Sequence, residues 1–292
     1  MTTRTPNPTI AILFMLAATT FIAGTMLLAK MLGSDLLGPP LHPLQISHGR
    51  FLFAFLAISS AVAVLRPRFT RPHLPLHIGR SALGWCGVTL MFAAVAFIPL
   101  ADATAISFVN PVFGMLLAIP LLGERVGPWR WLAALMAFCG TLILLRPGAD
   151  TFQITALLPL GAAVLLGLES IFIKKLADRE APLQILLINN AIGLTIATCA
   201  VVPVWMPPTP AQWAGLGALG IIVAAAQACY VNAMARADAS FVTPFSYLTL
   251  VFAATYDAVL FDVIPDRISV TGAAVILTGA SLLAWRERRL QV

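Results

Sequence analysis

Charged residues are scarce in this 292-residue chain, and their scarcity excludes an ordinary water-soluble protein. Only 10% of the residues are Asp, Glu, Lys or Arg, whereas a soluble domain carries about 25%. Hydrophobic residues make up 60% of the chain, and the mean hydropathy is +0.93. Most of the molecular surface is therefore expected to face lipid.

The motifs of the common enzymes and pumps are also missing. The sequence contains no HExxH, no phosphate-binding glycine loop and no GxSxG, and among the histidines only His48 falls within an apolar run. No soluble segment is long enough to form a nucleotide-binding domain. We therefore expect neither an enzyme nor a primary pump, and we expect no cofactor.

Cysteine is represented by four residues, all inside apolar runs and none with metal-ligand spacing: Cys86, Cys139, Cys199 and Cys229. We expect small packing residues and no metal site. The net charge of +6 would suggest nucleic acid as a partner of a soluble protein. Here the basic residues are confined to short loops, which indicates membrane orientation and no nucleic-acid partner.

Long apolar runs dominate the chain, and about 20 such residues cross a bilayer as a helix. They predict an all-α integral membrane protein with ten transmembrane helices. The expected spans are 9–30, 43–65, 81–101, 103–122, 129–145, 154–173, 182–203, 212–235, 239–261 and 268–285. The first run lacks a convincing cleavage site, so we expect it to be a retained helix.

The distribution of Lys and Arg predicts that both termini are cytoplasmic. Fourteen of the 18 basic residues fall on that side: Arg4, Arg66, Arg68, Arg71, Arg80, Arg125, Arg130, Lys174, Lys175, Arg179, Arg236, Arg286, Arg288 and Arg289. Only Arg146 and Arg267 fall in outside loops. Positive charge collects on the cytoplasmic side of membrane proteins, so a multi-pass protein of the inner (plasma) membrane is expected.

An internal repeat appears when the sequence is shifted by 139 residues, the offset between Pro43 and Pro182. The segment 43–46 (PLQI) then matches 182–185, and Gly140 matches Gly279. We expect two five-helix repeats, residues 1–148 and 149–292. Because five is odd, the second repeat is inverted, an arrangement typical of secondary transporters with alternating access.

The ordered motifs resemble the drug/metabolite transporter superfamily, and within it the EamA-type transporters, along essentially the whole chain. The resemblance rests on Ala29-Lys30, Arg50-Phe51, Asn110-Pro111-Val112-Phe113, Leu122-Gly123-Glu124-Arg125 and Gly140. The second half departs from the pattern, since Val263 stands opposite Glu124 and Leu250 opposite Pro111. The resemblance implies a secondary exporter of amino acids or related metabolites, similar in size to the YddG-like aromatic amino-acid exporters.

Four ionisable residues within the spans need a partner or a water-filled cavity: Lys30, Arg50, Glu169 and Asp257. Arg50 is a candidate substrate ligand or a snorkelling side chain. Glu169 is a candidate for cargo binding or proton coupling, or for an interfacial role beside Lys174. Lys30 and Asp257 are candidate coupling groups or interfacial charges.

Uncharged polar and aromatic residues complete the predicted substrate site. Trp85, Thr89 and Phe92 share a helical stripe, and Gln227 and Tyr230 share another. The remaining candidates are His48, Asn110, Asn189 and Tyr247. Such a lining suits a small amphipathic solute, although aromatic stripes also face lipid or neighbouring helices.

These features predict a secondary transporter whose partners are a small-molecule substrate and the lipid bilayer. Amino acids, aromatic or otherwise apolar, are the expected cargo. A carrier of multiple drugs or nucleotide-type metabolites is the first alternative, and a membrane receptor that binds without transporting is the second. Monomer and homodimer both remain open.

Overall fold

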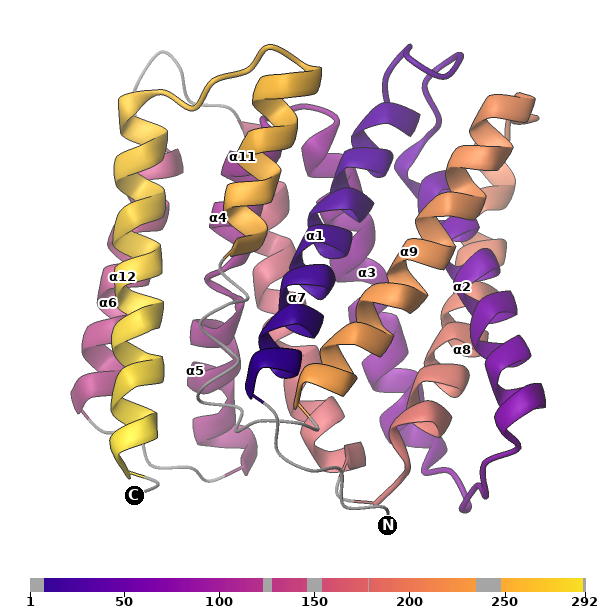
Figure 1. Ribbon diagram of the computed structural model, residues 1–292, viewed down its shortest axis with the longest axis horizontal. Coiled ribbons are helices and arrows are strands. Elements are labelled where there is room, and N and C mark those ends of the chain that lie inside the picture. The colour runs from indigo at the N-terminus through magenta and orange to yellow at the C-terminus, as the bar shows by residue number, and fades with distance from the viewer. Residues whose placement is uncertain (1–7, 123–127, 146–153, 178, 235–247, 291–292) are drawn as a thin grey trace.

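The computed structural model describes residues 8–122, 128–145, 154–177, 179–234 and 248–290. The described chain is helical throughout (Figure 1). Its helices are α1 (Pro8–Leu32), α2 (Pro43–Leu65), α3 (Leu74–Val95), α4 (Leu100–Ser107), α5 (Asn110–Leu122), α6 (Pro128–Leu145), α7 (Leu157–Ala177), α8 (Pro182–Val201), α9 (Pro210–Met234), α11 (Leu248–Leu260) and α12 (Arg267–Leu290). Two short 3₁₀ turns, Ile154–Ala156 and Val202–Val204, adjoin α7 and α8.

Proline sets where many of these helices begin. Pro8, Pro43, Pro128, Pro182 and Pro210 are each the first residue of a helix. Proline suits the first turn because its fixed φ is already helical and its missing N–H would have no partner there. The predicted starts of most helices are therefore close to the observed ones.

The fourth predicted span, 103–122, is not one continuous helix. The chain is helical in α4, is interrupted at Phe108 and Val109, and becomes helical again in α5. Pro111, at the second position of α5, explains the interruption, since proline lacks an N–H and disfavours helical geometry in the residue before it.

Six described helical segments are long and apolar enough to cross a membrane: Thr9–Leu32, Pro43–Leu65, Leu74–Val95, Ile154–Ile173, Pro182–Val204 and Pro210–Tyr230. The first part of the predicted span 239–261 and the Glu124 motif lie outside the described residues. The third helix begins seven residues earlier than predicted, at Leu74 instead of residue 81. Arg80, which we had expected in a loop, therefore lies inside α3.

Helices from the two halves of the sequence pack against one another. The most extensive contacts pair α1 with α9, α3 with α7, α2 with α8, and α6 with α12. α6 and α12 form a pair at one edge of the bundle (Figure 1). A Cβ atom at Gly140 of α6 would lie 2.7 Å from the carbonyl oxygen of Gly272 in α12, so only glycine permits this approach.

α1 begins and α12 ends at the same end of the bundle (Figure 1), which we name the terminal face. The other end is the opposite face. Cys86, Cys139 and Cys199 are exposed and Cys229 is half-buried, whereas small packing residues were expected at all four positions.

The repeated PLQI segments perform the same structural task at the two faces. On the opposite face the Gln45 amide donates to the carbonyl oxygen of Met206 and accepts from the Met206 N–H at 3.2 Å. On the terminal face the Gln184 amide donates to the carbonyl oxygen of Thr70 at 3.0 Å and accepts from its N–H at 2.8 Å. Each glutamine lies in the first turn of one helix of the α2–α8 pair. Its side chain forms hydrogen bonds with the backbone of the loop that follows the other helix.

We expect Gln45→Leu and Gln184→Leu each to destabilise the protein. Gln45→Leu removes two hydrogen bonds, and Gln184→Leu removes two such bonds together with those to Glu180 and the Thr70 hydroxyl. Each variant leaves a backbone N–H and C=O without partners, at a cost on the order of 1–3 kcal/mol. Thermal unfolding in detergent is the measurement. Thr198→Ala is the matched control, because exposed Thr198 bonds only within α8, to the Leu194 carbonyl. Glutamine variants with the same melting temperature as this control would contradict the assigned role.

Candidate functional site

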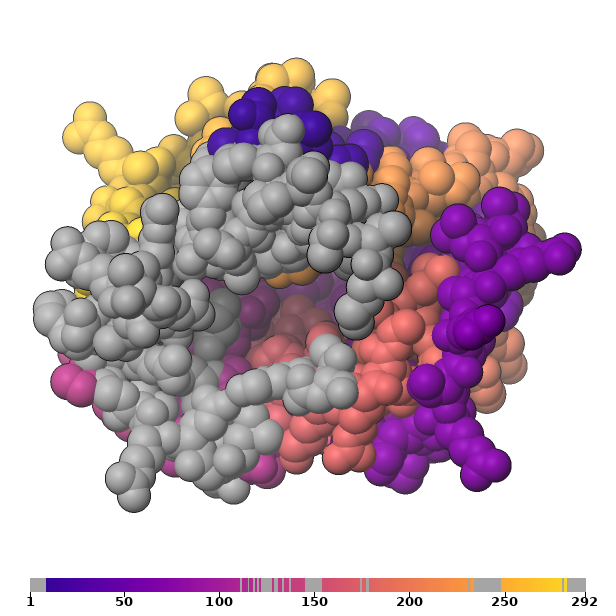
Figure 2. Space-filling model, turned by 60° about the horizontal axis from the view of Figure 1, so that its bottom comes forward, coloured from indigo at the N-terminus to yellow at the C-terminus, as the bar shows by residue number. Residues whose placement is uncertain are grey.

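A cavity of about 520 Å³, which we name the main cavity, lies between helices of the two halves. Ligand pockets typically have volumes of about 300–1,000 Å³. Its walls are mostly apolar, and the residues that line it are Ile22, Thr25, Met26, Arg50, Arg80, Val88, Phe92, Ile173, Pro182, Ile185, Leu186, Val223, Ala226, Gln227 and Tyr230. The terminal face, turned toward the viewer in Figure 2, is recessed beside the α7–α8 segment.

Arg50, on α2, is the predicted site residue that the structure places most clearly in this wall. Only 9% of the residue is exposed, and its guanidinium carbon lies 4.4 Å from the centre of the Phe51 ring. Among the described residues, no hydrogen-bond acceptor reaches its Nη1 atom. A buried guanidinium N–H without an acceptor is costly, so Arg50 has a donor available for a ligand.

Arg80 is the functional candidate that the sequence analysis missed. It is 6% exposed and lines the same cavity from α3. Its Nη1 donates to the Ile185 carbonyl at 3.3 Å, and its Nε lies 3.4 Å from Oε1 of Glu169 on α7. Pro75, at the second position of α3, is the signal that could have placed Arg80 within a helix.

Glu169, on α7, is close to Arg80 of α3. Lys175 is exposed, and Glu169 packs against the α3 backbone, where a Cβ at Gly84 would lie 2.7 Å from its Oε1 atom. Arg50 is near enough to experience the charges of both Arg80 and Glu169. Two cations, Arg50 and Arg80, therefore line the cavity, and one anion, Glu169, lies beside Arg80.

The other predicted site residues divide into two groups. Phe92, Gln227 and Tyr230 line the cavity with Arg50, and within the described residues the buried Oε1 of Gln227 has no hydrogen-bond partner. His48, Trp85, Thr89, Asn110 and Asn189 do not line it.

The second group has contacts between helices. Thr89 donates to Ser47 at 2.8 Å, Asn189 accepts from Ser81 at 3.1 Å, and the His48 ring meets Trp205 edge-on at 5.8 Å. For Thr89 and Asn189 the observed contacts are thus helix packing. Of the stripe formed by Trp85, Thr89 and Phe92, only Phe92 lines the cavity. Tyr247 lies outside the described residues.

Lys30 and Asp257 form one buried ion pair between α1 and α11. Lys30 Nζ lies 2.6 Å from Asp257 Oδ1, and the Asp257 side chain is 0% exposed. Asp257 Oδ2 also accepts the N–H of Ala101, at the start of α4, at 2.9 Å. Asp257 therefore has the buried partner that an ionisable group within a span needs. It also lines a smaller cavity of about 320 Å³.

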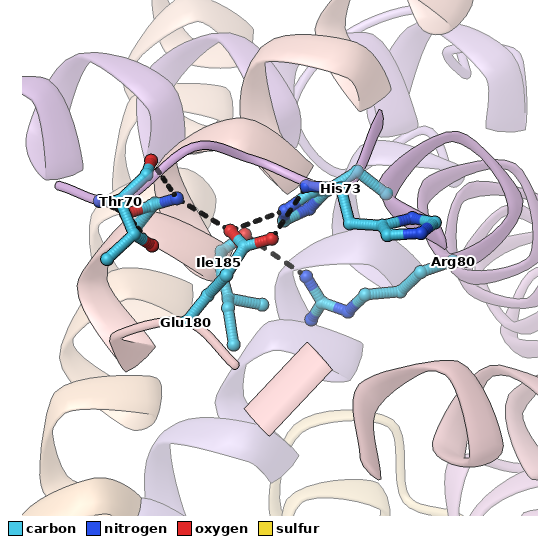
Figure 3. A network of polar contacts seen from close by, with 7 residues as sticks. Thr70, His73, Arg80, Glu180 and Ile185 are labelled. Atoms are coloured by element: carbon cyan, nitrogen blue, oxygen red, sulfur yellow. Dashed lines mark hydrogen bonds and ion pairs between the residues drawn. The ribbon is translucent and has the colours of Figure 1, made fainter. Parts of the chain in front are cut away.

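A network of polar contacts joins the two halves at the terminal face (Figure 3). Glu180, between α7 and α8, accepts from the His73 N–H at 2.9 Å, pairs with His77 Nε2 at 2.8 Å and accepts from Gln184 Nε2 at 2.7 Å. Burial raises the pKa of Glu180, but these hydrogen bonds and the charge of His77 outweigh it. The pKa of Glu180 therefore lies below its ordinary value of 4.5.

No group of three or more His, Cys, Asp or Glu side chains suited to a metal ion occurs in the described ranges. The main cavity offers the chemistry for binding a small organic solute: an apolar wall, two guanidinium groups and a few hydrogen-bonding groups, with the Glu169 carboxylate beside one of the guanidinium groups.

Apolar helices that enclose such a cavity define a multi-pass membrane transporter. The chain belongs to the EamA-like transporter family, whose sequence pattern matches residues 9–146 and again residues 153–285. The predicted resemblance is confirmed. The protein is accordingly a multi-pass inner-membrane transporter of small metabolites.

Its relatives carry chemically different solutes. The chain is 27% identical over 257 residues to the S-adenosylmethionine uptake transporter of Rickettsia bellii, covering 88% of each chain. It is 34% identical over 244 residues to the riboflavin transporter of Rhizobium johnstonii, covering 81% of this chain and 79% of that protein. A crystal structure at 22% identity shares the fold, with a TM-score of 0.65 over 98% of this chain and 100% of that one.

We expect Lys30→Met and Asp257→Asn each to destabilise the protein and the double variant to recover most of the loss. Removal of one partner leaves a buried charge uncompensated, at a cost of about 3–5 kcal/mol, whereas replacing both is often nearly neutral. Asparagine keeps an acceptor for the Ala101 N–H. A double-mutant cycle of thermal unfolding in detergent measures the coupling. Additive losses would contradict the ion pair.

We expect Glu180→Gln to lower the melting temperature at pH 6 and to lose this effect in acid. A carboxylate whose pKa is depressed by folding contributes stability above its unfolded-state pKa, and that stability is lost as the pH falls through the folded-state value. The difference from the unmodified protein should therefore shrink as the pH falls below 4.5. Asp35→Asn, at an exposed position, is the control. A difference independent of pH would contradict the role of the charge.

Proposed function

We propose that this transporter carries amino acids or close derivatives with an apolar or aromatic side chain, and that Arg50 binds their carboxylate. The observation that carries the proposal is the buried Nη1 of Arg50, which lacks an acceptor in the described structure at the wall of the main cavity. A carboxylate fits a guanidinium in charge and geometry. The apolar walls around Phe92 would receive the side chain.

The S-adenosylmethionine relative supports this assignment, because its named cargo carries the carboxylate and ammonium of an amino acid. The riboflavin relative favours a second candidate, an aromatic heterocycle of the flavin or nucleotide type. Riboflavin has no carboxylate. A cargo of that type would depend on the apolar walls, Gln227 and Tyr230 more than on Arg50.

We propose further that the two halves, residues 1–148 and 149–292, are inverted repeats that alternate access to the cavity. Three observations support this. The family pattern matches the chain twice. Gln45 and Gln184 make the same two hydrogen bonds at opposite faces. In the two halves, α1 corresponds to α7 and α3 corresponds to α9. The contact of α1 with α9 therefore has its counterpart in the contact of α7 with α3. The excess of basic residues assigns the terminal face to the cytoplasm.

The test is counterflow of radiolabelled amino acids in proteoliposomes with Arg50→Ala, Arg50→Lys and Arg68→Ala. Loss of a hydrogen-bonded charge costs about 1.5–3 kcal/mol, so Arg50→Ala should weaken half-saturation roughly 10- to 100-fold. Arg50→Lys should recover part of the loss, since lysine keeps the charge but not the planar fork. Arg68→Ala, at an exposed loop position, should behave as the unmodified protein.

Radiolabelled riboflavin and a radiolabelled nucleoside monophosphate belong in the same counterflow assay as alternative cargoes. Saturable amino-acid counterflow that depends on Arg50 would support the proposal. If riboflavin or the nucleotide is carried while no amino acid is, the cargo belongs to the second candidate class. Amino-acid flux that is indifferent to Arg50→Ala would overturn the role given to this side chain.

A further inference from the structure

The charged side chains that the structure describes around the main cavity do not neutralise one another, and one positive charge is left without a counter-ion. Arg50 and Arg80 line the cavity and contribute two positive charges, and Glu169, which pairs with Arg80, contributes one negative charge. Buried charges in a membrane protein are costly unless they are neutralised. One further negative charge in the cavity would complete the set.

The hydrogen bonds are incomplete in the same place. In the described part of the chain, Arg50 Nη1 and Arg80 Nε have no hydrogen-bond partner. The 3.4 Å approach of Arg80 Nε to Glu169 is an ion pair without the geometry of a hydrogen bond. Both arginines are more than nine-tenths buried. Two guanidinium donors on different helices thus lack acceptors in the described structure, and a carboxylate has two oxygen atoms that can accept from them.

Among the described residues, Glu169 forms an ion pair only with Arg80 Nε, at 3.4 Å, so a bound cation can compete for its carboxylate. Its nearest charged neighbour is at ion-pair distance, its side chain is 13% exposed, and its carboxylate rests against the bare backbone of Gly84. Ile173, one turn further along the same face of α7, lines the cavity. The carboxylate therefore lies near the cavity and can reach a cation bound there.

We propose that Glu169 is the specificity-determining residue of the cavity and selects zwitterions over simple anions. The substrate carboxylate binds Arg50 and Arg80 and takes over the neutralisation of Arg80. Glu169, released from Arg80, then binds the substrate ammonium group. The proposal rests on the function proposed above and adds its charge class: a solute with a carboxylate and an ammonium group close together.

The test compares three solutes that share one side chain but differ in charge. They are L-phenylalanine, N-acetyl-L-phenylalanine, which keeps only the carboxylate, and 2-phenylethylamine, which keeps only the ammonium. Each competes against the amino acid carried best in the counterflow assay. The unmodified protein should prefer the zwitterion to both analogues. The quantity compared among variants is a ratio of two concentrations: the concentration of L-phenylalanine that gives half-inhibition, divided by the concentration of its N-acetyl derivative that does so.

Glu169→Gln should shift this ratio at least about tenfold toward the N-acetyl derivative, the effect of losing one charged hydrogen bond. Gly84→Ala keeps the charge of Glu169 but displaces its carboxylate, so it should shift the ratio in the same direction and by less. Asp35→Asn removes an exposed carboxylate and should leave the ratio unchanged.

Glu169→Gln leaves Arg80 without its counter-ion and can impair folding, so the double variant Arg80→Gln/Glu169→Gln is made alongside it. Size-exclusion chromatography checks both proteins. The double variant should bind the two carboxylates equally through Arg50. If the ratio stays that of the unmodified protein in every folded variant, the role of Glu169 is wrong while the amino-acid function stands. If the unmodified protein carries no amino acid in the counterflow assay, both proposals fall.

Discussion

The cost of an ionised group in the membrane interior governs the arrangement of this protein. Such a group needs a partner or a water-filled cavity, and the described charges obey this rule in two different ways. Lys30 and Asp257 neutralise each other in a closed pair that also holds the start of α4. Arg50, Arg80 and Glu169 remain one negative charge short. The first arrangement is structural, and the second leaves binding capacity for a solute.

The helices around the cavity are joined by polar contacts at both faces. Gln45 holds the loop after α8, and Gln184 holds the loop after α2, with Glu180 extending the contacts at the terminal face. Backbone groups at a helix end are strong hydrogen-bonding groups that require partners. Using an amide from the other half to satisfy them ties the halves together at both faces, and the hydrogen bond from Ser81 to Asn189 joins them within the bundle.

An apolar cavity with few polar groups is also a reasonable basis for the chemical variety among relatives. Contacts with aliphatic and aromatic walls depend on shape and area more than on identity, so cargoes as different as S-adenosylmethionine and riboflavin are compatible with one architecture. Specificity then depends on a small number of charged groups. In this chain those groups are contributed by α2, α3 and α7, helices drawn from both halves.

The membrane setting, most helix starts and the family follow from the sequence alone, because lipid exposure demands long apolar runs, proline marks first turns, and the PLQI repeat is visible by a shift of the chain. The sequence also identified Arg50, since a lone arginine in an apolar run is conspicuous. Only the tertiary structure could decide the partners. Lys30 pairs with Asp257, 227 positions away, and Arg80 turns inward to Glu169. Which face of a helix meets which neighbour is set by packing between distant segments, and a linear pattern of hydrophobicity does not contain that information.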